Sequence, residues 1–234
     1  MPERPIVMSA ESVRALLEGR KTQTRRVVKP VPEGFHVDHC HWSKTGFALW
    51  YDDGGCSCRP VKCPYPVGTR LWVKETYTYY LGFGEDVGVD APVIYKADGP
   101  DECGQFPVIL NGERVRVNDR EPWRSPLFMP RWASRITLEV TDVRVQRLQD
   151  ISIGDALAEG VRCPDCGYTS LDAGFHMDHG ICVNKWLMES KVKDVGDHVA
   201  VQAFREHWDA INGKKHPWSQ NVWVWAFTFR RTDA

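Results

Sequence analysis

The sequence predicts an α+β fold: a small mixed β-barrel with a few short helices and cysteine-bearing insertions. Two observations support this. Segments rich in β-branched and aromatic residues dominate the chain, and the helical patterns between them are short. The predicted strands are 71–79, 135–145 and 222–229, and the predicted helices are 10–18, 151–160 and 201–211.

The first helix, Ala10–Glu18, has local signals at both of its ends. Ser9 is a suitable N-cap, and Gly19 favours a C-terminal stop. Val13, Leu16 and Leu17 fall on one helical face. The second predicted helix has Ser152 as its cap.

The predicted strands differ in their patterns. In 135–145, Ile136, Leu138 and Val140 alternate with Thr137, Glu139 and Thr141, which predicts one solvent-facing side. Segment 222–229 (VWVWAFTF) is apolar on both faces and predicts a buried central strand. We expect Trp223 and Trp225 on that strand to lie in the core.

The third helix is predicted from apolar residues at helical spacing. Val201, Phe204, Trp208 and Ile211 form the stripe, and Asn212-Gly213 closes the helix. Trp208 is therefore expected in the core.

Composition indicates a folded cytoplasmic protein. The hydrophobic fraction is 42% and there are ten tryptophans, which argues against disorder. The start MPERPIVM lacks the pattern of a signal peptide, and no apolar run is long enough to span a bilayer. Because the net charge is only −1, any binding of nucleic acid must be local.

Positive charge is concentrated in Gly19–Pro32, GRKTQTRRVVKPVP. This stretch holds five cations and no acid. Since it follows a predicted helix end, we expect the cations in a defined loop that suits a phosphate or a polar nucleic-acid group. A solvated basic turn is the alternative interpretation. The cations are Arg20, Lys21, Arg25, Arg26 and Lys29.

A nucleophile–base pair is possible inside this stretch. The hydroxyl of Thr24 becomes a useful nucleophile only when a nearby base takes its proton. Lys21 can be that base if the pKa of its ammonium is lowered, and crowding by cations or partial burial lowers it.

One group of cysteines and histidines has the spacing of a zinc site. Cys163-x2-Cys166-x12-His179-x2-Cys182 supplies four ligands, with His176 as an alternative. Four protein ligands leave no open position, so the predicted zinc is structural. Free reduced thiols are the alternative.

A second metal site is suggested by Cys40, Cys56, Cys58 and Cys63, close to histidines at 36, 39 and 41. Its spacing is less specific. A surface insertion with reduced cysteines, or one ion shared by both groups, would explain the same residues.

Trp132 lies between Arg131 and Arg135 in PRWASR. An aromatic ring among cations suits stacking on a nucleobase. Packing against the protein is the favoured interpretation, because one aromatic residue near two arginines is common.

The segment GRKTQTRR (Gly19–Arg26) resembles the signature loop of ASCH-domain proteins, which have a PUA-like fold. In this order, further segments are similar to the longer ASCH-type proteins of bacteriophage and prophage genomes. The resemblance implies a single domain over residues 1–234, with insertions at about 33–62 and 162–196. The further segments are Pro66–Thr76, Met129–Val140, Leu148–Val161 and Phe204–Gly213.

Some small ASCH-domain proteins are amidohydrolases that remove the acetyl group from N4-acetylcytidine, and this chain is similar to them at Lys21, Thr24 and Glu159. The resemblance implies that Thr24 attacks the acetyl carbonyl and Lys21 activates Thr24. Glu159 would orient the lysine or handle the proton of the leaving group, and Arg26 would bind the nucleoside or stabilise the oxyanion. No cofactor is implied for this reaction.

The chain also departs from those enzymes, which are under half its length and lack the cysteine insertions. Arg25 stands beside Thr24 where they tend to carry an apolar residue, so the pocket would suit a phosphorylated nucleotide or a polynucleotide. Glu75 is another carboxylate that could reach the cations, or it forms an ion pair on a strand face. The expected substrate-binding residues are Arg20, Arg25, Arg26, Glu75, Trp132 and Arg135.

Three other functions remain open from the sequence. A non-catalytic RNA-binding module would use the same cations. A ribonuclease would need Lys21, Glu159 and Arg26 but not Thr24. A purely structural phage role would leave the cationic cluster without a purpose. No membrane partner is expected, and the sequence identifies no protein partner.

Overall fold

The computed structural model describes residues 3–29, 41–43, 47–51, 58–80, 92–110, 113–118, 122–161 and 199–232. The chain divides into two compact units. The first comprises Met1–Glu18, Gly68–Glu139 and Arg230–Ala234, and the second Gly19–Val67 and Val140–Phe229. No helix among the described residues is long and apolar enough to cross a membrane.

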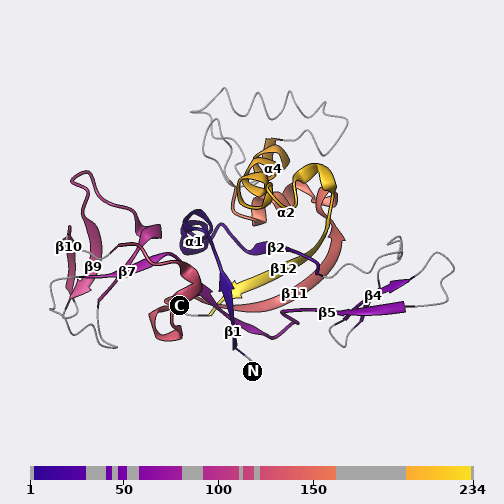
Figure 1. Ribbon diagram of the computed structural model, residues 1–234, viewed down its shortest axis with the longest axis horizontal. Helices are drawn as coiled ribbons and strands as arrows, with labels where there is room; N and C mark the ends of the chain where they lie inside the picture. The colour runs from indigo at the N-terminus through magenta and orange to yellow at the C-terminus, as the bar shows by residue number, and fades with distance from the viewer. Residues whose placement is uncertain are drawn as a thin grey trace, which may run out of the picture. The chain divides into compact units, whose positions relative to one another are not determined.

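A five-stranded sheet has the strand order β1-β6-β11-β12-β2 (Figure 1). Strands β1 and β6 are parallel, whereas β11 pairs antiparallel with β6, and β12 with β2. Strands β11 and β12 contribute residues to both units. The bounds are β1 (Glu3–Val7), β2 (Gln23–Val27), β6 (Arg70–Lys74), β11 (Thr137–Arg147) and β12 (Trp223–Arg231).

The predicted α+β class is confirmed, but the described strands do not close into the predicted small mixed β-barrel. A barrel requires its two edge strands to pair with each other. Here β1 and β2 stand at opposite ends of the strand order, so the described sheet is open.

In the first unit, the predicted N-terminal helix is observed as α1 (Ala10–Leu17). The Ser9 hydroxyl accepts a hydrogen bond from the Ser12 amide at 3.2 Å, which satisfies one of the free N–H groups of the first turn. After the helix, Gly19 has a φ of +73°, a conformation that glycine adopts without steric cost. The predicted N-cap at Ser9 and the predicted stop at Gly19 are therefore both confirmed.

The strand predicted over 71–79 is two strands, β6 and β7 (Tyr77–Tyr79), separated by Glu75 and Thr76. Strand β7 pairs antiparallel with β8 (Val93–Tyr95), in a sheet separate from that of β6. The prediction merged them because their composition is continuous. A further antiparallel pair of this unit consists of β9 (Phe106–Leu110) and β10 (Glu113–Val117).

Strand β11 follows the predicted alternation only in part. Ile136, Leu138 and Val140 are buried as expected. Thr137, however, is only 8% exposed, whereas Thr141 is exposed. The predicted solvent-facing side therefore begins further along the strand. In the described part of the chain before β11 lie the 3-10 turns η2 (Lys96–Asp98), η3 (Pro126–Phe128) and η4 (Arg131–Ala133).

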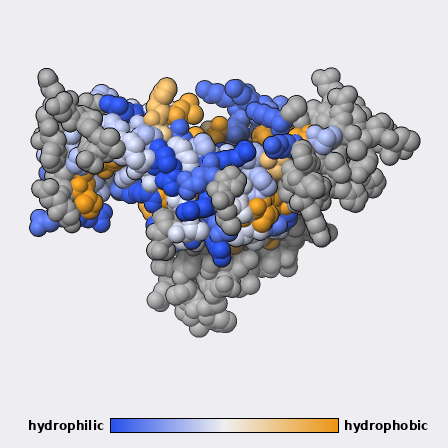
Figure 2. Space-filling model, turned by 90° about the horizontal axis from the view of Figure 1, so that it is seen from below, coloured by the Kyte–Doolittle hydropathy of each residue, from blue (hydrophilic) through white to orange (hydrophobic). Residues whose placement is uncertain are grey.

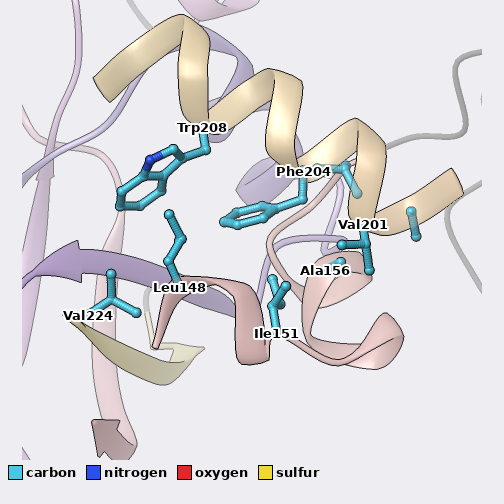
Figure 3. Packing of buried hydrophobic residues seen from close by; sticks show 9 residues of the cluster. Leu148, Ile151, Ala156, Val201, Phe204, Trp208 and Val224 are labelled. Carbon is cyan, nitrogen blue, oxygen red and sulfur yellow. The ribbon is translucent and has the colours of Figure 1, made fainter. Parts of the chain in front are cut away.

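The second unit has a core between helices and strands (Figure 3). Helix α2 (Ile153–Ala158) begins at the predicted cap, where the Ser152 hydroxyl accepts from the Asp155 amide at 3.1 Å. Helix α4 (Val199–Asn212) packs beside α2 (Figure 1). The buried members of this cluster are Leu148, Ile151, Ala156, Val161, Ala200, Val201, Phe204, Trp208 and Val224.

Trp208 is in this core as predicted, at 3% exposure. Ile211 is not, because it is 54% exposed at the end of the helix. The prediction of a buried central strand is confirmed by β12, which lies between β11 and β2. Of its two tryptophans, Trp225 is buried, whereas Trp223 is only half-buried, with the guanidinium carbon of Arg147 4.4 Å from its ring centre.

Three shorter strands of the second unit form an antiparallel sheet within the stretch predicted as the first insertion. They are β3 (His41–Ser43), β4 (Phe47–Tyr51) and β5 (Cys58–Lys62). The second predicted insertion, 162–196, lies outside the described residues. Two further 3-10 turns among the described residues are η5 (Leu148–Asp150) and η9 (Trp218–Gln220).

Candidate functional site

The cationic segment lies along the C-terminal end of α2. The guanidinium of Arg20 donates to the Gly160 carbonyl, the ammonium of Lys21 to the Glu159 carbonyl at 2.8 Å, and the amide of Thr22 to the Ala158 carbonyl at 2.8 Å. The last carbonyls of a helix have no partners within it and carry partial negative charge. Two cations therefore contact the end of α2 where the backbone favours them.

Lys21 and Glu159 form a buried ion pair. The Lys21 Nζ lies 2.7 Å from Glu159 Oε2, with side-chain exposures of 2% and 4%. The Lys21 ammonium also donates to the backbone carbonyl of Glu159, so Glu159 accepts two hydrogen bonds from it. An ammonium carries three N–H groups. Among the described residues, the third has no partner.

Arg25 is held by the opposite oxygen of the same carboxylate. Its Nη1 lies 3.0 Å from Glu159 Oε1, and its Nη2 lies 3.2 Å from Asp155 Oδ2. The guanidinium carbon is 5.6 Å from the ring centre of Phe204, and the side chain is fully buried. Arg25 was expected to bind substrate, but this structure places it inside, where it holds Glu159.

Asp155 belongs to the same network, although the sequence analysis did not select it. Its Oδ1 accepts from Gln23 Nε2 and from Arg144 Nη2, each at 2.9 Å. Asp155 and Glu159 are four residues apart and share one helical face. That spacing opposite a basic segment was a signal that could have identified Asp155.

Thr24 and its neighbours lie on a strand, not in the predicted loop. Strand β2 pairs with β12 so that Thr24 is opposite Phe227 and Arg26 is opposite Trp225. Since successive side chains of a strand alternate, Thr24 and Arg26 share one face and Arg25 lies on the other. The Thr24 side chain is buried, and among the described residues its hydroxyl makes no hydrogen bond to Lys21.

Burial lowers the pKa of two of these cations, Lys21 and Arg26. Removal of Lys21 from water lowers the pKa of its ammonium below 10.5, although the Glu159 carboxylate opposes the shift. Burial likewise lowers the pKa of the Arg26 guanidinium, opposed by Tyr65 and Glu159. Tyr65 packs edge-on against Phe227 with the ring centres 5.3 Å apart. The ammonium of Lys21 is thus less favoured than in water.

Glu75 and Arg135 form a separate cluster in the first unit. The Arg135 guanidinium donates to both Glu75 oxygens, at 3.0 and 3.1 Å, and lies 2.7 Å from Asp98 Oδ1. Its carbon is 3.9 Å from the ring centre of Tyr95. Glu75 is only 1% exposed, and burial raises its pKa although Arg135 opposes this. Both residues, expected to bind substrate, are engaged in this ion-pair network.

Trp132 lies on the surface of the first unit. It is 45% exposed and stacks on Tyr79, with ring centres 6.1 Å apart and planes 19° apart. One part of the ring is therefore packed, as the sequence analysis favoured, and another part faces outward.

The predicted zinc ligands Cys163, Cys166, His176, His179 and Cys182 lie outside the described residues, as do Cys40 and Cys56. Cys58 is described only as the first residue of β5. Cys63 is buried at 1% exposure and forms no disulfide bond with a described cysteine. Within the described ranges, no three His, Cys, Asp or Glu side chains are grouped to hold a metal.

Comparison of the chain with family models, with curated proteins and with solved structures found no match.

Proposed function

We propose that the chain is a PUA-like protein of the ASCH type that binds a modified nucleoside, nucleotide or RNA and hydrolyses an acyl amide on the base, as in N4-acetylcytidine. The observation that carries this proposal is the buried contact of 2.7 Å between Lys21 Nζ and Glu159 Oε2. It joins the two residues that the resemblance pairs, 138 positions apart in the chain. The mixed α+β core of the described residues is compatible with a small α+β fold.

Lys21 acts as the base in the proposed reaction. Burial lowers the pKa of its ammonium, which favours the neutral amine. Glu159 engages two of the three positions around Nζ. A neutral amine held in this way directs its lone pair to the third position, where it takes the proton of the nucleophile. Shifted lysine pKa values of this kind suit general-base catalysis.

Thr24 supplies the nucleophile. Its Oγ1 attacks the acyl carbon while its proton passes to Lys21 Nζ, and a tetrahedral oxyanion forms. Collapse breaks the carbon–nitrogen bond, and Lys21 returns the proton to the amine that leaves. Water then hydrolyses the Thr24 ester with Lys21 as base again. The Lys21–Thr24 hydrogen bond required here forms in the substrate complex, since catalytic hydrogen bonds are often long without substrate.

Two arginines support this chemistry in different ways. Arg25 is fully buried against Glu159, Asp155 and Phe204, so it positions the carboxylate that orients Lys21. Arg26 is on the Thr24 face of β2 and only half-buried. Arg26 is therefore the cation assigned to the nucleoside or to the developing oxyanion.

The test is hydrolysis of N4-acetylcytidine by wild type, Thr24→Ala and Lys21→Ala, followed by chromatography of the nucleosides. Thr22→Ala is the matched control, because the Thr22 side chain is exposed and its contacts with Ala158 and Phe229 use the backbone. We expect turnover in wild type and in the control, and none in the other two variants. Absence of turnover in wild type would refute the proposal.

The same wild-type and variant proteins, assayed for cleavage and binding of RNA, distinguish the two alternative functions. Cleavage of RNA that needs Lys21 but not Thr24 would indicate a ribonuclease. Binding of RNA without cleavage or deacylation would indicate a binding module, for which Thr24→Ala weakens binding only slightly.

A further inference from the structure

The first unit carries three exposed apolar side chains close together in sequence. Leu127 is 66% exposed, Phe128 is 78% exposed and Trp132 is 45% exposed. We call them the apolar patch. They belong to η3 and η4, just before β11. On the face seen in Figure 2, hydrophilic residues predominate among the coloured residues, and hydrophobic residues form small groups among them. Exposed apolar side chains of this size, gathered on one segment, indicate a contact surface.

The backbone beneath the patch is fixed to the neighbouring strands. The Tyr77 hydroxyl donates to the Phe128 carbonyl at 3.1 Å, and the Lys74 ammonium donates to the Leu127 carbonyl. Met129, next along the chain, is buried, and its sulfur accepts from the Glu75 amide at 3.2 Å. The carbonyls are thus held by the protein while the side chains of Leu127 and Phe128 remain exposed. Because this backbone is already held in place, it loses little conformational entropy when the exposed side chains bind a partner.

Trp132 extends a stack of aromatic and cationic groups. Its ring lies nearly parallel to that of Tyr79, at 19°. The guanidinium carbon of Arg124 is 4.7 Å from the centre of the same Tyr79 ring. Because Trp132 keeps 45% of its surface exposed, a further planar ring could contact it.

Cations lie beside aromatic rings of the same unit. The Lys74 ammonium and the Arg131 guanidinium lie 5.4 and 5.9 Å from the ring centre of Trp72. Glu3 lies 3.0 Å from Arg131 and 3.7 Å from Arg70, so its single charge is shared between two arginines. Arg124 and Arg131 are exposed. Exposed cations therefore lie next to aromatic rings of this unit.

We propose that this surface binds single-stranded RNA, with unpaired bases stacked on Phe128 and Trp132 and phosphates near Arg124 and Arg131. Exposed aromatic rings beside cations suit single strands, whose bases are free to stack, better than an apolar protein partner. The choice of RNA over DNA rests on the proposed function, whose substrate is a ribonucleoside. The surface extends the proposed substrate class from the free nucleoside to the same nucleoside within a single-stranded polynucleotide.

The test measures fluorescence anisotropy with a short labelled uridine-rich RNA, the matching DNA strand and the corresponding RNA duplex. The variants are Phe128→Ala and Trp132→Ala, and Ile109→Ala is the control. Ile109 is also exposed, at 60%, but lies on β9, away from η3 and η4 in sequence. Because Phe128 is largely exposed, its truncation leaves the core intact.

We expect wild type and the control to bind the single-stranded RNA equally, and each aromatic variant to bind about tenfold more weakly. Binding of wild type should weaken as salt increases, and Arg131→Ala should reduce this salt dependence by about one phosphate contact. Equal loss of affinity for the DNA strand would also support the stacking surface.

Three results would overturn the proposal: no RNA binding by wild type, aromatic variants that bind as the control does, or binding of the duplex alone. Self-association of wild type that Phe128→Ala abolishes, without RNA binding, would assign the surface to a second copy of the chain instead. Deacylation of the free nucleoside is measured separately. Failure of the RNA surface therefore leaves the hydrolase proposal standing, and the reverse also holds.

Discussion

The ammonium of Lys21 and the carboxylate of Glu159 lie 2.7 Å apart, with both side chains almost completely removed from water. Burial of a charge is costly unless an opposite charge and hydrogen bonds compensate it. Glu159 compensates two cations, because its other oxygen lies 3.0 Å from Arg25. Glu159 is therefore the carboxylate that the two buried cations share, while Asp155 pairs with Arg25 alone of the two.

Replacement of that carboxylate should destabilise the protein strongly. We expect Glu159→Gln to lower the free energy of unfolding by about 3–5 kcal/mol, the usual effect of leaving a buried ion pair incomplete. The measurement is urea unfolding followed by tryptophan fluorescence. Glu139→Gln is the control: Glu139 pairs with Arg230, whose side chain is 69% exposed, so its loss should cost about 0–1 kcal/mol. Equal effects of the two changes would contradict the assigned role of Glu159.

The lowered pKa of Lys21 makes stability depend on pH in a defined direction. At pH values between the lowered pKa of folded Lys21 and 10.5, the unfolded chain keeps the proton on Lys21, whereas the folded chain has begun to release it. The free energy of unfolding of wild type should therefore rise, relative to Lys21→Met, as the pH increases from the lowered pKa toward 10.5. Urea unfolding of both proteins over a pH series measures the difference. A difference that falls with pH in this window would mean that the ion pair raises the pKa of Lys21.

Helix α4 should contribute to stability through one face only. Phe204 is 2% exposed, lies in the core of Figure 3 and contacts Arg25, so Phe204→Ala should cost about 3–5 kcal/mol. Ile211, on the same helix, is 54% exposed. Its replacement by alanine should change the free energy of unfolding by less than about 0.5 kcal/mol. Chemical denaturation of the two variants side by side checks this contrast.

We predict that the purified protein contains one structural zinc ion, held by Cys163, Cys166, His179 and Cys182, with His176 as the alternative ligand. Elemental analysis of protein prepared without chelator should find about one zinc per chain, in agreement with a four-ligand site. Cys163→Ser should lose the metal. Two zinc ions per chain would support the second site at Cys40, Cys56, Cys58 and Cys63, and the absence of zinc would refute both sites.

The elements that the sequence predicted well are those with local signals. Ser9 and Ser152 cap the two short helices at the expected positions, because a cap depends only on the next turn of the chain. The central position of β12 followed from its apolar residues on both faces. These features require no knowledge of distant partners.

Other features depend on partners that no local pattern identifies. Strand β2 was predicted as a loop because its cations follow the expected end of a helix, whereas in the structure the buried Arg25 pairs with Asp155 and Glu159. The contact of Arg25 with Phe204 likewise joins two elements far apart in the chain. The pairing of Lys21 with Glu159 was expected only through a family resemblance.

The order of strands in the sheet has a consequence for folding kinetics. Strand β2 lies near the start of the chain, whereas its neighbour β12 lies near the end. The Lys21–Glu159 contact spans 138 positions. Contacts of such high sequence separation form slowly, because a long loop must close before they stabilise the chain. We therefore expect the candidate site to assemble in the last, slow phase of refolding. Recovery of its function would then report completion of the native topology, whereas helix content would recover earlier.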